Sequence, residues 1–217
     1  STYAWFIGMQ TVSVTSFDVE IAVTDSLLLS FDGETWDTTV SISEGTLNEV
    51  SYEGHTNSWG GDGLFPVSSI GEMDEESSRM MLFEKASLTA TPGGYRLLAS
   101  RVDNYSSPEQ PEQDGYVAFD LFIKNFSGTQ YISDLNELDE EAIYLTTDSA
   151  VEVAEGGVAD TGIENSVRVA FAQIGRVIGT TTDAGVITGI TCSDDGDVTG
   201  VCRTAQIWEP NDTDHDL

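Results

Sequence analysis

The stretch that most constrains the fold of this chain lies near its start, at residues 3–9. In an extended strand, successive side chains point to opposite faces. Four apolar side chains of this stretch would share one face and two the other, namely Tyr3, Trp5, Ile7 and Met9 against Ala4 and Phe6. Leaving such a surface in water costs about 25 cal/mol per Å² of apolar area. We therefore expect it to be covered, either by the chain's own sheet or by the open groove of a neighbouring copy.

The apolar pattern changes phase just after this stretch. Val12 and Val14 occupy even positions, whereas the apolar side chains between residues 17 and 23 occupy odd ones. Because the period of a strand is two, a slip of one residue moves the buried set to the other face of the sheet. The pattern therefore predicts a bulge, bend or hinge at Thr15 and Ser16. Residues 1–14 are accordingly predicted to form a separable N-terminal strand.

Charge is the outlying property of the composition. The 217 residues include 38 acidic and only 8 basic side chains, for a net charge of −30. Binding to nucleic acid or to an anionic membrane needs clustered Lys and Arg, so this composition argues against both partners. Self-repulsion indicates a saline or cation-rich environment, or charge neutralised by bound cations. The simpler alternative is a solvated acidic surface without a specific ligand.

Several features predict an extracellular protein. No apolar run approaches the length of about 20 residues that a membrane span needs. The chain opens on Ser1 without a charged segment, so we expect a mature protein whose secretion signal has been removed. Cys192 and Cys202 bracket an Asp- and Gly-rich stretch, which fits a disulfide across a hairpin in an oxidising compartment. The alternative for this pair is two free buried thiols.

Three Asn-X-Ser/Thr sequons also favour an extracellular protein, and they begin at Asn104, Asn125 and Asn211. A chain this rich in Ser and Thr can also contain them by chance. Glycans are therefore candidate modifications of these three asparagines, in an organism that glycosylates.

The remaining chain is a series of short apolar runs separated by Gly-rich turns. Predicted strands cover residues 17–23, 27–31, 36–42, 116–123, 143–145, 151–153 and 167–173, with hairpins joining 88–91 to 95–99 and 186–190 to 203–208. Residues 116–123 are the strongest of these and are expected in the centre of a sheet. Residues 73–85 fit a helix, although residues 80–83 fit a buried strand equally well, and residues 134–141 fit a short helix. Residues 45–66 are expected to be a long surface connection whose end docks back on the core.

This organisation predicts an all-β fold with few short helices. The expected architecture is an antiparallel β-sandwich of jelly-roll type over residues 15–209, preceded by the strand of residues 1–14 and followed by an acidic flexible tail at 210–217.

Motifs for catalysis are missing from the sequence. The two histidines, His55 and His215, have no evident partners and are expected to be solvated bystanders. No HExxH zinc motif, nucleophile elbow or phosphate-binding glycine loop occurs, so no enzyme and no organic cofactor is expected. Calcium is the one candidate ligand, because Asp194, Asp195 and Asp197 surround a Gly turn and calcium prefers oxygen ligands. The spacing is not that of an EF-hand, and a plain Asp/Gly turn held by the disulfide is the alternative.

Four segments resemble the TasA/camelysin-like secreted proteins, which are subunits of biofilm-matrix fibres and have the archaeal bundling pilins among their relatives. The segments are Tyr-Ala-Trp-Phe at residues 3–6, the strand at 27–30 with its Asp-Gly turn at 32–33, residues 115–121 and residues 165–171. The similarity spans roughly residues 1–175 and consists of strand patterns. It implies a jelly-roll fold and a donor strand, in which the N-terminal segment of one subunit fills a groove in the next.

Some members of that family have been described as metallopeptidases. This chain lacks an HExxH motif, so that activity is not carried over. The cysteine pair and the sequons are additions that the resemblance does not explain.

The leading functional hypothesis is a structural subunit of an extracellular filament, such as a pilus or a biofilm-matrix fibre. Residues 1–14 would act as a donor strand that pairs with the next copy, giving a head-to-tail homopolymer that does not close. One alternative is a monomeric secreted adhesion or binding module whose N-terminal strand folds into its own sheet. Another is a surface-lattice protein, which would form sheets or shells. A type IV pilin is disfavoured because no long apolar N-terminal helix is present.

Overall fold

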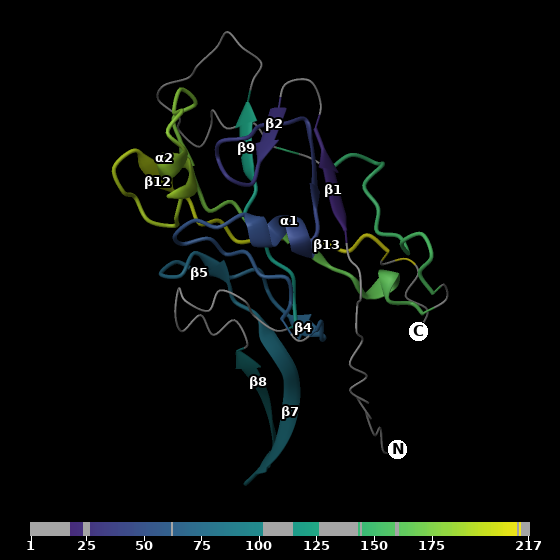
Figure 1. The fold of residues 1–217 in the computed structure, drawn as a ribbon. Helices are drawn as coiled ribbons and strands as arrows, with labels where there is room; N and C mark the ends of the chain where they lie inside the picture. The colour runs from purple at the N-terminus through teal and green to yellow at the C-terminus, as the bar shows by residue number, and fades with distance from the viewer. Residues whose placement is uncertain are drawn as a thin grey trace.

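A computed structural model describes residues 18–23, 27–61, 63–101, 115–125, 143, 145–158, 161–211 and 213 of the chain (Figure 1). For residues 84–91 and 95–100 it describes the backbone alone. The predicted donor strand at 1–14, the hinge at Thr15 and Ser16 and the predicted helix at 134–141 lie outside the described residues.

The described residues form mainly strands, which confirms the all-β class with few short helices. The strands are β1 (Val19–Ala22), β2 (Leu27–Ser30), β3 (Thr39–Ile42), β4 (Val67–Ser68), β5 (Met73–Asp74), β6 (Arg79–Met80), β7 (Phe83–Thr91), β8 (Gly94–Arg101), β9 (Phe122–Asn125), β10 (Val169–Phe171), β11 (Gly175–Val177), β12 (Val198–Gly200) and β13 (Gln206–Trp208). The helices are α1 (Glu44–Glu49), α2 (Ala184–Thr188) and the 3₁₀ turn η1 (Glu164–Ser166).

The strands are arranged as several small antiparallel sheets. Five sheets are pairs, β1–β3, β2–β9, β5–β6, β10–β13 and β11–β12, and the sixth has three strands in the order β4–β7–β8. Within the described part of the chain these sheets do not join into one continuous ladder. The jelly-roll sandwich therefore stays a prediction.

Among the described residues, Leu29 of β2 and Ile42 of β3 are the most deeply buried apolar side chains. Leu29 of β2 is fully buried, and its backbone exchanges two hydrogen bonds with Asp37, at 2.8 and 3.0 Å. Ile42 of β3 is buried beside the start of α1, where Ser43 caps the helix by accepting a hydrogen bond from the backbone N–H of Thr46. Ile187 of α2 is also buried. The buried apolar side chains of the described residues are Leu29, Ile42, Leu47, Leu82, Ile187, Val198 and Ala205.

The turn after β2 follows the predicted Asp-Gly signal. Asp32 accepts hydrogen bonds from the backbone N–H groups of Glu34 (2.8 Å) and Thr35 (2.7 Å), and from the hydroxyl of Ser30 (2.9 Å). Gly33 takes a positive φ of 74° and lies against Ile187. The burial of Asp32 raises its pKa, but these hydrogen bonds outweigh that effect and leave the pKa below its usual value of 3.8. The turn thus ties β2 to α2.

Two other predictions are confirmed closely. The alternation around residue 20 forms β1, where Val19 and Ile21 are half-buried and Glu20 is exposed, and β1 pairs with β3. The hairpin expected around residues 92–94 is longer than predicted, because β7 and β8 pair from Phe83 to Arg101.

The helix predicted over residues 73–85 is wrong, and the strand alternative at residues 80–83 holds only at its ends, where Met80 belongs to β6 and Phe83 to β7. Asp74 accepts hydrogen bonds from the backbone N–H groups of Glu76 and Ser77, at 3.1 and 3.2 Å. This Asx-type turn, followed by a positive φ of 54° at Ser78, reverses the chain between β5 and β6. The local carboxylate therefore stabilises a turn and not a helix start.

The last predicted hairpin is also wrong. Residues 184–188 form α2, because the side chain of Asp183 accepts a hydrogen bond from the backbone N–H of Gly185 at 2.9 Å and caps a helical turn. Residues 206–208 form β13, which pairs with β10 instead. The five residues at 186–190 are too few to show a period that distinguishes a strand from a helix.

Residues 116–123 do not form the expected central strand. Only β9, which begins at Phe122, belongs to a ladder, and it pairs with β2. Ile123 is 41% exposed. The backbone N–H of Asp120 donates to the side chain of Asn57 at 2.8 Å, so a loop takes the place of a neighbouring strand.

Three further expectations need correction or confirmation. Residues 145 and 151–153 are not strands, and both Ile143 and Leu145 are largely exposed. The connection at 45–66 begins with α1 and buries Asn57 and Ser58, so much of it is not a surface loop. Its end docks back as predicted, since Leu64 forms a β-bridge with Gly115.

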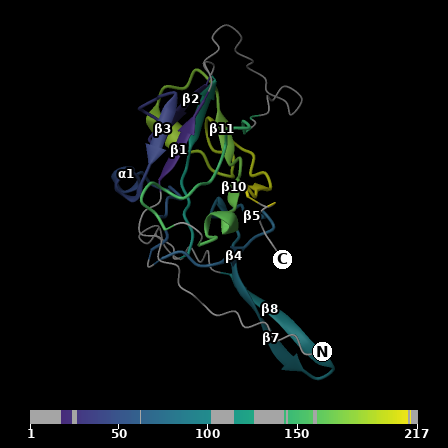
Figure 2. The same cartoon turned by 90° about the vertical axis from the view of Figure 1, so that its right-hand side faces the viewer.

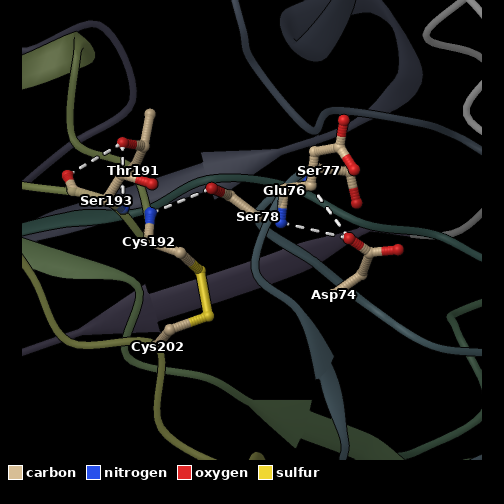
Figure 3. The surroundings of a disulfide bond; sticks show 8 residues. All are labelled: Asp74, Glu76, Ser77, Ser78, Thr191, Cys192, Ser193 and Cys202. Atoms are coloured by element: carbon tan, nitrogen blue, oxygen red, sulfur yellow. Dashed lines mark hydrogen bonds between the residues drawn. A yellow bond between two sulfur atoms is a disulfide. The ribbon is translucent and has the colours of Figure 1, made fainter.

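The predicted disulfide is confirmed and stabilises the C-terminal part (Figure 3). Cys192 and Cys202 are bonded, with Cα atoms 4.8 Å apart, and the backbone N–H of Cys192 donates to the hydroxyl of Ser78 at 2.9 Å. This hydrogen bond joins the disulfide to the turn between β5 and β6. The disulfide itself spans ten residues, and it is the hydrogen bond to Ser78 that connects parts of the fold far apart in the sequence.

Gly200 is required next to this disulfide. A Cβ at position 200 would overlap the backbone carbonyl of Cys192 and lie 2.8 Å from the backbone nitrogen of Ser193. We expect Gly200→Ala to lower the free energy of unfolding by about 2 kcal/mol, through overpacking against backbone that cannot move away. Chemical denaturation of the oxidised protein measures the change.

The matched control is Gly45→Ala, at an exposed position inside α1 where the nearest atom lies 3.9 Å from the added Cβ. There we expect a gain of about 0.5 to 1 kcal/mol, because alanine favours a helix interior. Equal stability of the two variants would contradict the packing argument.

Candidate functional site

The β7–β8 hairpin is the feature of the fold that stands apart from the rest. It extends away from the other described elements in both views (Figures 1 and 2). Its strands are in direct register from Ala86 opposite Ala99 to Thr91 opposite Gly94, beyond an irregularity between Glu84 and Ala86. β4 pairs with β7 only at Phe83 and Glu84, at the base. Beyond that base, the hairpin is a two-stranded ribbon.

Such a ribbon exposes backbone groups along its edges. β7 lies between β4 and β8, so β8 is an edge strand of this sheet within the described part of the chain. A two-stranded hairpin is at best marginally stable in water, and an unpaired strand edge is a template for pairing with another chain. The hairpin therefore has the geometry of an interaction element.

The charge of the hairpin differs from that of the whole protein. No aspartate or glutamate occurs between Glu84 and Asp103, whereas the chain as a whole carries 38. Arg101, at the base, forms an ion pair of 2.7 Å with Asp74. This hydrogen-bonded ion pair holds the pKa of Asp74 below its usual value. The ribbon is consequently a carboxylate-free surface on a strongly acidic protein.

The residues predicted for assembly are Tyr3, Ala4, Trp5, Phe6, Ile7, Met9, Val12 and Val14, and all lie outside the described residues. Their sequence shares the property of the hairpin, because residues 1–17 contain no charged side chain. The role of this segment stays a prediction.

A polar cluster around Asp120 is the second feature, and sequence reasoning missed it. The Tyr52 hydroxyl donates to the Asp120 carboxylate at 2.6 Å, and the Thr56 backbone N–H donates to the same oxygen at 2.9 Å. The Thr56 hydroxyl donates to the other carboxylate oxygen. Asn57 accepts from the backbone N–H of Asp120. These bonds fasten the loop after α1 to the segment that leads into β9.

His55 belongs to this cluster and is not the solvated bystander that was expected. Its Nδ1 accepts from the backbone N–H of Asn57 at 3.2 Å, and its ring meets the ring of Tyr52 edge-on, with centroids 5.7 Å apart. Its carbonyl accepts from the guanidinium of the buried Arg79 at 3.2 Å. The tight sequence spacing of Tyr52, His55 and Thr56 was a usable signal, but their partner Asp120 is more than 60 residues away.

Burial controls the protonation of this cluster. It raises the pKa of Tyr52, and the neighbouring Asp120 charge adds to that effect, so the phenol stays a donor. Burial lowers the pKa of His55; the Asp120 charge opposes the shift and the Arg79 charge supports it. Neutral imidazole is the form that can accept the hydrogen bond from Asn57. The cluster is a structural clasp with all of these groups engaged.

The candidate calcium residues Asp194, Asp195 and Asp197 lie in and beside a tight turn before β12. The Asp194 carboxylate accepts from the backbone N–H of Gly200 at 2.9 Å, and Asp195 and Val198 close a tight turn through two backbone hydrogen bonds. Asp197 lies within that turn. Among the residues that the structure describes, no group of three or more His, Cys, Asp or Glu side chains could hold a metal ion. Calcium at these residues stays an untested prediction.

The three candidate glycosylation sites have different surroundings. Asn104 lies outside the described residues, and Asn125 is exposed at the end of β9. The side-chain amide of Asn211 donates to the carbonyls of Val151 and Glu164, at 3.2 and 3.0 Å. A glycan on Asn211 would replace one of these two hydrogen bonds, whereas Asn125 has an accessible surface.

Comparisons with known proteins do not place the chain in a family: no family model, curated protein or solved structure matches it. Among the described helices, none has the length and apolar character required to cross a membrane.

The clasp predicts a cost for removing Asp120. We expect Asp120→Ala to lower the free energy of unfolding by about 1.5 to 3 kcal/mol, since the Tyr52 hydroxyl and the Thr56 N–H lose a charged acceptor. Tyr52→Phe removes one of these bonds and should cost less.

Denaturation at constant salt measures both changes. Asp148→Ala, at an exposed carboxylate, is the matched control for the change in net charge and should stay within about 0.5 kcal/mol of the parent protein. A loss at Asp148 as large as that at Asp120 would contradict the clasp.

His55 predicts a dependence of stability on pH. Because its pKa in the folded protein lies below the ordinary 6.5, the unfolded chain takes up the proton first as the pH falls. The contribution is fully present above pH 6.5 and is lost as the pH falls toward the folded pKa. In melting curves taken between pH 7.5 and 5, His55→Asn should show a smaller decline than the parent protein. His215→Asn, which removes the chain's other histidine, should keep the parent's decline, and identical slopes for all three proteins would refute the assignment.

Proposed function

We propose that this protein is a structural subunit of an extracellular filament of the TasA/camelysin-like kind, and that residues 1–14 act as the donor strand. The observation that supports this most directly is the arrangement of the described strands in small sheets with open edges. Polymerisation by strand addition requires such an edge in each subunit. It also requires a strand to donate, and the uncharged apolar pattern of residues 3–9 is suited to that role.

Surface composition supports an assembled protein. Exposed large apolar side chains include Ile70 at 77%, Val158 at 76% and Phe171 at 45% exposure. Single exposed apolar residues are common, but here they accompany a core of only a few buried apolar side chains among the described residues. The disulfide between Cys192 and Cys202 suits an oxidising extracellular compartment. We propose a scaffolding role and assign no catalytic residue.

The second candidate is a secreted monomeric adhesion or binding module. The protruding β7–β8 hairpin favours it, because a ribbon that extends from the body could contact a different partner (Figure 2). The two candidates differ in what the N-terminal segment does: it joins subunits in the first and completes the subunit's own sheet in the second.

Removal of residues 1–14 separates them. The full protein should form uniform filaments in negative-stain electron microscopy, more readily in high salt or calcium because cations screen the net charge of −30. The truncated protein should stay folded by circular dichroism and remain monomeric.

The control is removal of residues 214–217, which should leave filaments unchanged. Filaments from the N-terminally truncated protein would refute donor-strand exchange. Loss of folding on truncation would favour the monomeric module, and sheets or shells from the full protein would favour a surface lattice.

A further inference from the structure

We propose that the edge of β8 is the acceptor for residues 3–9 of a second copy, so that the donor strand extends the β4–β7–β8 sheet across the boundary between subunits. This inference rests on the proposed function and specifies the partner surface that it requires. Three features of the described strands select β8: its length, its position in the sheet and its charge.

Length favours β8 over the other edges. The donor stretch spans seven residues with continuous apolar alternation, and β8 has eight residues. The strands of the five paired sheets have only two to four residues each. An incoming strand gains backbone hydrogen bonds in proportion to the residues it pairs, so a short edge could hold only part of the donor.

Position in the sheet separates β8 from β7. The outer side of β7 is already occupied by β4 at Phe83 and Glu84, and its register with β8 is irregular between Glu84 and Ala86. Both features interrupt a continuous ladder along that side. β8 has no such interruption from Tyr95 to Ser100, and no other described strand joins its sheet beyond it.

The absence of carboxylates from both strands allows them to pair. The net charge of −30 opposes close contact between two copies almost anywhere on their surfaces. Residues 1–17 carry no charge, and the only charged residue from 86 to 100 is Arg96. Two carboxylate-free strands can therefore lie side by side without like-charge repulsion, which destabilises directly opposed pairs in a sheet.

Pairing would also stabilise the hairpin. Among the described strands, it is joined only at its base, by β4 (Figure 1). A third strand along its whole length gives β8 neighbours on both sides, and sheets of three or more strands with an apolar face reach independent stability. The pairing would cover the apolar pattern of residues 3–9 and provide partners for the backbone groups along the edge of β8.

Disulfide trapping in assembled protein tests the geometry. Both native cysteines are bonded to each other, so an introduced cysteine is the only free thiol. One variant carries Ile7→Cys. A second set, extended by a size tag, carries a single cysteine at one position from 95 to 100 in β8. Equimolar mixtures are assembled and oxidised with glutathione disulfide, and mixed dimers are read on non-reducing gels.

The matched control set carries the cysteine in β7, at positions 84 and 86 to 90, which are opposite positions 100 and 99 to 95 in the hairpin register. Neighbouring strands lie about 4.8 Å apart, so a donor beside β8 is about 9.6 Å from β7. A disulfide needs Cα atoms closer than about 7 Å. We therefore expect mixed dimers with at least one β8 position and none with β7. Ala4→Cys is the second donor variant, in case Ile7→Cys prevents assembly.

The outcomes distinguish the two proposals. Mixed dimers confined to β8 support the inference. Filaments that need residues 1–14 but yield mixed dimers only with β7, or with neither strand, overturn the acceptor assignment and leave the proposed function standing. A full protein that stays monomeric in calcium and in high salt overturns both.

Discussion

Repulsion among carboxylates limits how any two surfaces of this protein can meet. With 38 acidic and 8 basic side chains, most of the chain repels a second copy. At physiological ionic strength, salt screens the repulsion between charges that are farther apart than about 8 to 10 Å. Contacts are therefore easiest where carboxylates are absent. The sequence has three long segments without them, at residues 1–17, 85–102 and 165–182. The first is the predicted donor, the second contains most of the protruding hairpin, and the third contains β10 and β11.

The interior of the described part of the chain depends on more than hydrophobic burial. Few apolar side chains are fully buried in the described part of the chain, so hydrophobic burial is supplemented by polar and covalent connections. Asp120 fastens the loop after α1 through three side-chain hydrogen bonds, and the Cys192–Cys202 disulfide is joined to the turn before β6 through Ser78. Both connections link segments distant in sequence. They restrict the body of the protein, while the hairpin beyond β4 has no comparable connection among its described contacts.

The sequence predicted the features that depend on neighbouring residues. The alternation of β1, the Asp-Gly turn after β2, the hairpin at residues 92–93 and the disulfide all follow from local patterns, and the structure confirms them. It did not predict which strands pair, because a strand pattern of period two does not identify its partner. Residues 116–121 have the pattern of a central strand, yet they join no ladder of the described strands, and Asp120 forms hydrogen bonds with Tyr52 and Asn57 of a neighbouring loop.

The polar cluster was missed for the same reason. The Gly- and Ser-rich sequence around His55 predicts a solvated side chain. Its environment is instead set by Asp120 and Arg79, which are distant in sequence. The predictions for residues 73–85 and 186–190 were wrong for a different reason. In each segment the hydrogen bonds of one aspartate, Asp74 or Asp183, determine whether the backbone forms a turn or a helix. Capping by Asp74 and Asp183 involves one or two hydrogen bonds, which is too small a signal to see in an apolar pattern.

Strand addition is well suited to a protein with this charge. Ion pairs between subunits would weaken in the saline or cation-rich surroundings that its acidity indicates, because exposed charges are screened by salt. Backbone hydrogen bonds between strands involve no net charge, and burial of apolar side chains is strengthened by excluded salts. A contact made of an uncharged apolar strand and a carboxylate-free edge therefore keeps its attraction as salt rises, while the repulsion between the surrounding acidic surfaces falls. In the proposed filament, the net charge of −30 would keep copies apart in dilute solution and make assembly dependent on the ionic strength of the surroundings.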